Sequence, residues 1–166
     1  MSKVITFSRT YPNYHPRAGE PTYFVEQIWN GFRDDYFALS DDYIPFVQKY
    51  VRLKAVGEPL HFGGVKHHTI RAGHRWKAGD WFSPRVWSGR PYNSKQIQFA
   101  PDIQIKKTWP FMCDGLDGWF MDGRQFTLSW SERLAMNDGL TLYDMQEWFN
   151  KPLVGQIICW NESIEY

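Results

Sequence analysis

The sequence predicts a mixed α+β fold, a small β-barrel of about six strands with flanking helices. Segments of helical period occupy much of residues 22–55, whereas short segments rich in aromatic and β-branched residues begin near residue 63. So many short strands in succession do not suit a sheet of alternating strands and helices. The 166 residues fit one domain, so we expect a single domain over 1–166 with a helical elaboration around 22–55.

The first third of the chain predicts one strand and two helices. Residues 4–7 alternate as a strand does, and a loop containing Pro and Gly follows over 11–21. Thr22 is placed to cap a helix whose apolar residues recur at helical spacing: Val25, Ile28, Trp29, Phe32 and Tyr36. A second helix is expected to begin near Asp41 and Asp42 and to end before Gly57 and Pro59.

The rest of the chain predicts strands and then two short helices. The expected strands are 66–71, 81–87 and 96–105, a hairpin of 118–121 with 125–128 around Asp122-Gly123, and a final buried strand over 153–160. A short helix is expected over 131–136, and a second is expected after a cap at Thr141. The intervening Asn137-Asp138-Gly139 is either a helix stop or a loop that belongs to a site.

Charge is segregated along the chain although the net charge is only +1. Residues 61–110 carry nine Lys and Arg against two acidic residues, and residues 111–166 carry three against nine. Four Trp are interleaved with the basic residues: Trp76, Trp81, Trp87 and Trp109. This middle third is either a surface for RNA or a nucleotide, or a solvated face whose charges pair with the acidic third.

Several classes of function are disfavoured by missing signals. The sequence has no phosphate-binding loop, dinucleotide fingerprint, zinc-protease helix, hydrolase nucleophile elbow or calcium loop. The His cluster of residues 61–74 lacks thiolates or carboxylates at ligand spacing, so we expect no metal and no cofactor. No long apolar run or leader-like start is present, so we expect a cytoplasmic protein without a membrane partner.

The stretch Val65-Lys66-His67-His68-Thr69-Ile70-Arg71 is the most informative one for chemistry. A hydroxyl, a base and a group that protonates a leaving amine suffice for amide hydrolysis. Thr69 offers the hydroxyl, and Lys66 can act as base where burial and neighbouring cations lower its pKa. On a regular strand these two side chains face opposite sides, so Lys66 must precede the strand or a bulge must intervene.

The same stretch, followed by Gly73 and by Trp76-Lys77-Ala78-Gly79-Asp80, resembles the ASCH superfamily. That superfamily has a barrel related to the PUA fold, which binds RNA, with a Lys-x-x-Thr-Ile-Arg strand. The resemblance extends to residues 4–7 as the first strand and to residues 137–142 before the late helix. It implies a PUA-like barrel that recognises RNA, a nucleotide or a modified nucleoside in a basic pocket.

One branch of the superfamily, the bacterial acetylcytidine amidohydrolases, is similar at the residues that would carry function. This resemblance implies catalytic roles for Lys66, Thr69 and Asp138, and a reaction that removes an acyl group from the cytosine amine. The family has Glu where this chain has Asp138, whose carboxylate is retracted by ~1.5 Å. A displacement of that size can cost about 100-fold in rate.

Further residues are candidates for ligand binding around the same pocket. Arg75 and Trp76 follow the motif and suit contact with a phosphate and stacking on a base, although a Trp that closes one end of a barrel fits as well. His68 and Arg71 belong to the motif strand, and Arg9 leaves the first strand. The alternative function is a protein-interaction module without catalysis, in which the basic segment docks an acidic partner.

Overall fold

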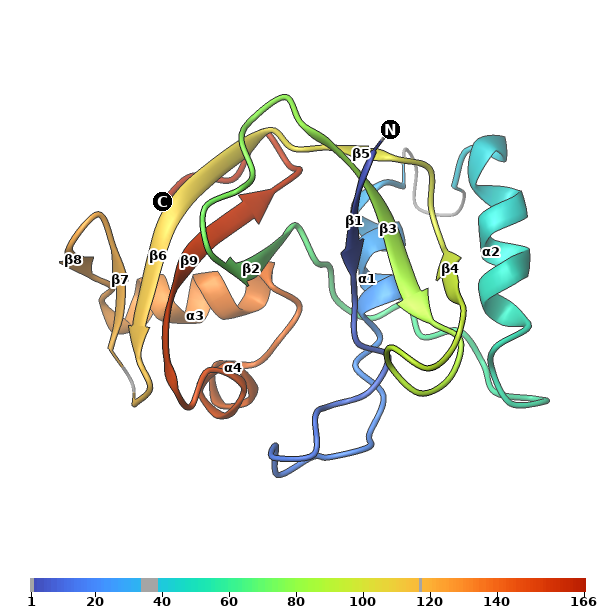
Figure 1. Ribbon diagram of the computed structural model, residues 1–166, viewed down its shortest axis with the longest axis horizontal. Helices are drawn as coiled ribbons and strands as arrows, with labels where there is room; N and C mark the ends of the chain where they lie inside the picture. The colour runs from blue at the N-terminus through green and yellow to red at the C-terminus, as the bar shows by residue number, and fades with distance from the viewer. Residues whose placement is uncertain (1, 34–38, 117) are drawn as a thin grey trace.

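Two sheets, each covered by helices, organise the chain (Figure 1). The structure, a computed structural model, describes residues 2–33, 39–116 and 118–166. One sheet has the order β1-β3-β4, with β5 also paired to β3, and contains β1 (Lys3–Thr6), β3 (Trp81–Trp87), β4 (Gln96–Gln98) and β5 (Ile103–Gln104). The other has the order β2-β9-β6-β7-β8, with β2 (His68–Ala72), β6 (Lys107–Asp114), β7 (Trp119–Met121), β8 (Arg124–Gln125) and β9 (Pro152–Cys159).

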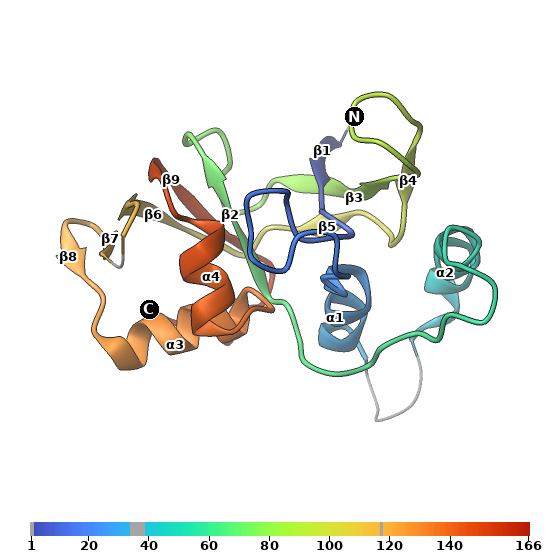
Figure 2. The same cartoon turned by 90° about the horizontal axis from the view of Figure 1, so that it is seen from below.

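The helices lie against the faces and edges of these two sheets (Figure 1, Figure 2). They are α1 (Phe24–Gly31), α2 (Ile44–Val51), α3 (Leu128–Asn137) and α4 (Leu142–Trp148), with a 3₁₀ turn over Asp41–Tyr43 leading into α2. Figure 2 shows α1, α3 and α4 on the same side of the two sheets. None of the helices among the described residues is long and apolar enough to cross a membrane.

The expected α+β class is therefore confirmed, but the strand pattern differs from the prediction. The described strands number nine instead of about six, and their pairing forms two ladders that do not close into one barrel. The predicted strand 96–105 is broken into β4 and β5 around Ala100-Pro101, because proline has no N–H to donate to a ladder. The sequence prediction has no strand over residues 107–114, where β6 lies. A sheet tolerates Pro110 there because β7 pairs only with Met112 and Cys113 and so needs no N–H from residue 110.

Helix boundaries also differ in detail. α1 begins at Phe24 after Tyr23, whose φ is +58°, so Tyr23 and not Thr22 holds the capping position, although the Thr22 hydroxyl accepts from the Phe24 N–H at 3.4 Å. The same hydroxyl donates to the Ser8 carbonyl at 2.7 Å. The Thr141 cap is confirmed, since its hydroxyl accepts from the Asp144 N–H at 3.0 Å. Tyr36, expected on the first helix, lies outside the described residues.

β9 joins the two parts of the core because alternate residues on a strand face opposite sides. Ile158 packs with Trp29, Phe82 and other buried residues around α1 and the first sheet. Ile157 packs with Leu134 and other buried residues around α3 and α4. Residues 155–159 of β9 are thus buried on both faces, and β2, which pairs with them, is held where the two clusters meet.

Candidate functional site

Lys66 lies just before β2, between two helices that fix its backbone. Its N–H donates to the carbonyl of Gln27 in α1, and the next N–H, that of His67, donates to the carbonyl of Asn137 at the end of α3. On a regular strand, Lys66 and Thr69 would face opposite sides. Lys66 precedes β2, so its side chain does not have to follow that alternation and can reach the side that Thr69 faces. The first of the two geometric solutions expected from the sequence is therefore the one adopted.

The Lys66 side chain meets Asp138 inside the protein. Its Nζ donates to Asp138 Oδ1 at 2.8 Å and to the Asp138 carbonyl at 2.6 Å, and it lies 4.1 Å from the centre of the Phe24 ring. Lys66 is 1% exposed and Asp138 is 4% exposed. The Asp138 side chain is thus long enough to bind the Lys66 ammonium, although it is one methylene shorter than the Glu of the amidohydrolases.

Asp138 is placed there by the end of α3. Its N–H donates to the carbonyls of Leu134 and Ala135, and Gly139 then reverses the chain with a φ of +78°. A Cβ at residue 139 would lie 2.1 Å from the Gln27 Oε1 and 3.3 Å from the Lys66 Cβ. Residues 137–139 are therefore both a helix stop and part of the site, the two readings that the sequence left open.

A second chain of polar contacts reaches Asp138 from the other side. Tyr166 Oη lies 2.7 Å from His68 Nε2 and accepts from the Asn137 amide at 2.9 Å. His68 Nδ1 lies 3.3 Å from Asp138 Oδ1, without the alignment of a full hydrogen bond. This arrangement fits a neutral His68 whose Nδ1–H faces the carboxylate and whose Nε2 accepts the Tyr166 proton, an assignment made from the network.

Thr69 and Arg71 line a cavity of about 60 Å³ together with Lys66 and Asp138. Its walls come from the segment after β1, from α1, from β2 and from the end of α4, and include Phe7, Ser8, Phe24, Ile70, Trp148 and Phe149. No hydrogen bond engages the Thr69 hydroxyl among the described residues. The three side chains that the amidohydrolase resemblance singled out thus reach one cavity.

Arg71 adds a cation that no described carboxylate pairs. One of its terminal nitrogens donates to the Thr6 carbonyl at 2.6 Å, and its buried Nε–H has no partner among the described residues. With Lys66 paired to Asp138, the Arg71 charge is in excess at the cavity. Such an uncompensated guanidinium favours a ligand that is anionic or that becomes anionic as it reacts.

Burial dominates the titration of the site. It lowers the pKa of Lys66 more than Asp138 raises it. Burial also pushes the pKa of Asp138 upward, but Lys66 and His68 outweigh that effect and hold the carboxyl pKa below its usual range. The pair is therefore an ammonium that releases its proton more readily than a solvated lysine, beside a carboxylate that stays ionised.

The stability of the protein is expected to fall on mild acidification because of the buried histidines. Burial lowers the pKa of His68 below its ordinary 6.5, against the attraction of Asp138, and lowers that of half-buried His67 in the same direction. Below pH 6.5 these histidines bind protons in the unfolded chain but stay neutral in the folded one. The free energy of unfolding therefore falls by up to ~1.4 kcal/mol per pH unit for each group.

Urea denaturation at pH 7 and pH 5 measures this slope. His68→Asn is expected to flatten it, since Asn keeps an N–H donor but does not titrate. His74→Asn, at an exposed position, is expected to retain the wild-type slope. A slope unchanged by His68→Asn would contradict the assignment of a neutral buried His68.

Of the five predicted ligand residues, only Arg71 lines the cavity; His68 contacts Asp138 without lining it, and the other three lie elsewhere. Trp76 is only 4% exposed and packs on Phe82, so its ring belongs to the core and not to a stacking surface. Arg75 lies over that same Trp76 ring, 5.2 Å from its centre. Arg9 donates to the carbonyls of Leu53 and Ser88, so it does not line the Lys66 cavity.

No sequence pattern indicates that Tyr166, Phe24 or Trp148 belongs to the site. Phe24 and Trp148 have the helical spacing of core residues, and Tyr166 follows the last strand by several residues. Their roles depend on the packing of α1 and α4 against β2, which a single sequence does not reveal.

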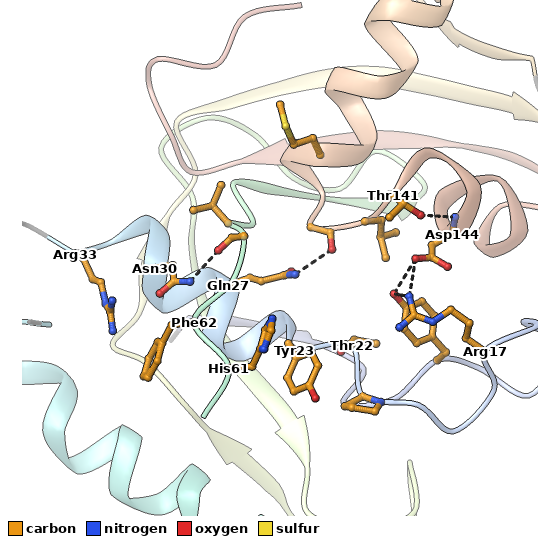
Figure 3. A pocket seen from close by; sticks show the side chains of 17 residues that line it. Arg17, Thr22, Tyr23, Gln27, Asn30, Arg33, His61, Phe62, Thr141 and Asp144 are labelled. Carbon is orange, nitrogen blue, oxygen red and sulfur yellow. Dashed lines mark hydrogen bonds and ion pairs between the residues drawn. The ribbon is translucent and has the colours of Figure 1, made fainter. Parts of the chain in front are cut away.

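A larger cavity of about 1040 Å³ lies beside α1 and shares no lining residue with the small one (Figure 3). We call it the α1 groove; its lining includes Tyr23, Gln27, Asn30, Arg33 and His61. Size alone would favour it as the reactive site. Its carboxylate, Asp144, is however already bound by Tyr11 and Arg17, and none of its residues repeats the Lys66 arrangement.

No group of three or more His, Cys, Asp or Glu side chains in residues 2–33, 39–116 and 118–166 is arranged to hold a metal ion. Comparison of the chain with protein-family models, with curated proteins and with solved structures found no match in any of the three. The geometry of the site therefore carries the functional argument by itself.

Proposed function

We propose that the protein hydrolyses a small acyl amide on a nucleoside, with an acylated cytosine amine as the preferred substrate. The observation that carries the proposal is the convergence of Lys66, Asp138 and Thr69 on one cavity, with the cation of Arg71 beside them. These groups supply a hydroxyl nucleophile, a proton acceptor of lowered pKa and a stabiliser for an oxyanion.

The reaction proceeds through an acyl ester in this proposal. The Thr69 hydroxyl gives its proton to neutral Lys66 and its oxygen attacks the acyl carbon, while Arg71 stabilises the negative charge on the carbonyl oxygen. The carbon–nitrogen bond then breaks and the leaving amine takes the proton from the Lys66 ammonium, which Asp138 holds in place. Water finally hydrolyses the ester, which releases the carboxylic acid and restores Thr69.

The size of the cavity supports a small acyl group as the part of the substrate that enters. About 60 Å³ suits a group of a few heavy atoms and is too little for a nucleoside. The base would therefore remain at the mouth, near exposed Ser8 and half-buried Trp148. The proposal thus favours acetyl over larger acyl groups.

We further propose that the two sheets are an opened form of the PUA-like barrel of the ASCH superfamily. A hydrogen bond between the two sheets supports this: the Arg71 guanidinium in β2 donates to the carbonyl of Thr6 at the end of β1, at 2.6 Å. Both cysteines are free and buried, which fits the reducing cytoplasm that we propose as the location.

Recognition of RNA without hydrolysis is the second candidate, and the basic segment 61–110 favours it. Binding that depends on phosphate neutralisation weakens steeply as salt increases. A protein that binds single-stranded RNA in this way but leaves acetylcytidine intact would support the second candidate over the first.

The test of the first candidate is the release of cytidine from acetylcytidine, followed by chromatography. We expect turnover by the wild type, a loss of at least about 100-fold for Thr69→Val, and recovery to within about tenfold for Thr69→Ser. The matched control is Thr108→Val, because Thr69 and Thr108 pair with Ile158 from opposite sides of β9. No turnover in the wild type, or equal losses in both Val variants, would overturn the proposal.

A further inference from the structure

The α1 groove contains a row of aromatic and cationic side chains that the reaction above does not use. Figure 3 shows Arg33, Phe62, His61 and Tyr23 along one wall, at the opposite end from Arg17 and Asp144. His61 stacks on Tyr23 with ring centres 4.4 Å apart and planes 29° apart, and the Arg33 guanidinium lies 4.3 Å from the centre of the Phe62 ring. The wall thus combines flat apolar faces with a cation.

The charges of the groove leave Arg33 available for an anion. Asp144 accepts from Arg17 at 2.8 Å and from Tyr11 at 3.2 Å, and Arg17 also pairs with Glu20. Among the described residues no carboxylate pairs with Arg33, and its Nε–H has no hydrogen-bond partner. Arg33 is therefore a charge of the groove that no carboxylate of the described residues compensates.

Two amides on α1 leave their oxygens without donors. Gln27 donates through its nitrogen to the Gly139 carbonyl at 3.1 Å, and Asn30 donates to the Gly64 carbonyl at 2.8 Å. These bonds fix both amides, and neither Gln27 Oε1 nor Asn30 Oδ1 has a partner within the described part of the chain. A buried oxygen without a donor costs about 1–3 kcal/mol, which a ligand N–H or a water relieves.

We propose that the α1 groove is a second binding site, for a nucleoside monophosphate. Its planar ring packs against the His61–Tyr23 stack, ring N–H groups reach the amide oxygens of Gln27 and Asn30 after small movements of the wall, and the phosphate pairs with Arg33. The volume of about 1040 Å³ is at the upper end of the range for small-ligand sites, so a nucleotide fits without rearrangement of the fold. This inference does not depend on the proposed hydrolysis.

Isothermal titration of the whole protein with cytidine and adenosine 5′-monophosphates tests the proposal. The two nucleosides and inorganic phosphate form separate arms. We expect at least one nucleotide to bind more tightly than its nucleoside and than phosphate. Arg33→Gln is expected to weaken nucleotide binding by about tenfold and nucleoside binding little, because it removes a charge-assisted bond. His61→Ala is expected to weaken both.

Two control variants make the result specific to the groove. Arg124→Gln removes an exposed arginine of β8, and Thr69→Val alters only the small cavity; both are expected to bind nucleotide as the wild type does. Absence of nucleotide binding, equal binding of phosphate alone, or unchanged affinity in Arg33→Gln would overturn the proposal. Loss of binding in Thr69→Val would also overturn it, by placing the ligand in the reaction cavity.

Discussion

Replacing Lys66 with methionine is expected to lower the free energy of unfolding by about 3–5 kcal/mol. Methionine keeps most of the volume but removes the ammonium, which leaves the Asp138 carboxyl 4% exposed and without its main partner. Urea denaturation measures the change. Acetylcytidine turnover is expected to disappear in the same variant, because the proposed proton acceptor is gone.

The double variant Lys66→Met, Asp138→Asn separates the pair from general damage to the core. Because it removes both charges, it is expected to lose less stability than the sum of its single variants. Lys106→Met, which breaks a pair with exposed Glu162, serves as a surface control and is expected to change stability by less than about 0.5 kcal/mol. Strict additivity of the two buried substitutions would contradict the buried ion pair.

Replacing Gly155 with alanine is the second change with a large expected effect, about 3 kcal/mol or more. Gly155 lies in β9 opposite Ala72 of β2 and Phe111 of β6. A Cβ there would lie 2.0 Å from the Arg71 carbonyl oxygen and 2.8 Å from the carbonyl carbon. These are backbone atoms, so no side-chain rotation relieves the overlap, and β2 must move away from β9.

This displacement is expected to impair the site as well as stability, because β2 carries Thr69 and Arg71 into the cavity. Thermal unfolding and acetylcytidine turnover measure the two effects. Gly89→Ala is the matched control, since its Cβ would meet the Ser94 side chain only at an ordinary 3.5 Å. A Gly155→Ala variant as stable and active as Gly89→Ala would contradict the close approach of the two strands.

The sequence predicted three of the residues that line the small cavity better than it predicted what surrounds them. Lys66 and Thr69 are close along the chain in one motif, and Asp138 lies within a recognisable helix stop to which the family resemblance extends. The contact between His68 and Tyr166 joins residues 98 positions apart and had no local signal. Trp76 is of a residue type that often stacks on bases, but it packs on Phe82 of β3 and therefore belongs to the core.

In the fold, too, features set by residues near one another in the sequence were predicted, and pairings between distant segments were not. The α+β class and the Thr141 cap follow from periodicity and turn residues, which act over a few positions. Whether strands close one barrel or form two sheets depends on which distant edges pair. β1 pairs with β3 and β2 pairs with β9, and no pattern in the four segments specifies those partners.

In the proposed reaction, Thr69 carries the acyl group as an ester during turnover. Rapid acid quenching with acetylcytidine, followed by peptide mapping with mass spectrometry, locates that group. We expect an acetyl ester on Thr69 in the wild type and none in Thr69→Val. Turnover with the acetyl group found on the Lys66 amine, or never found on Thr69, would contradict the account.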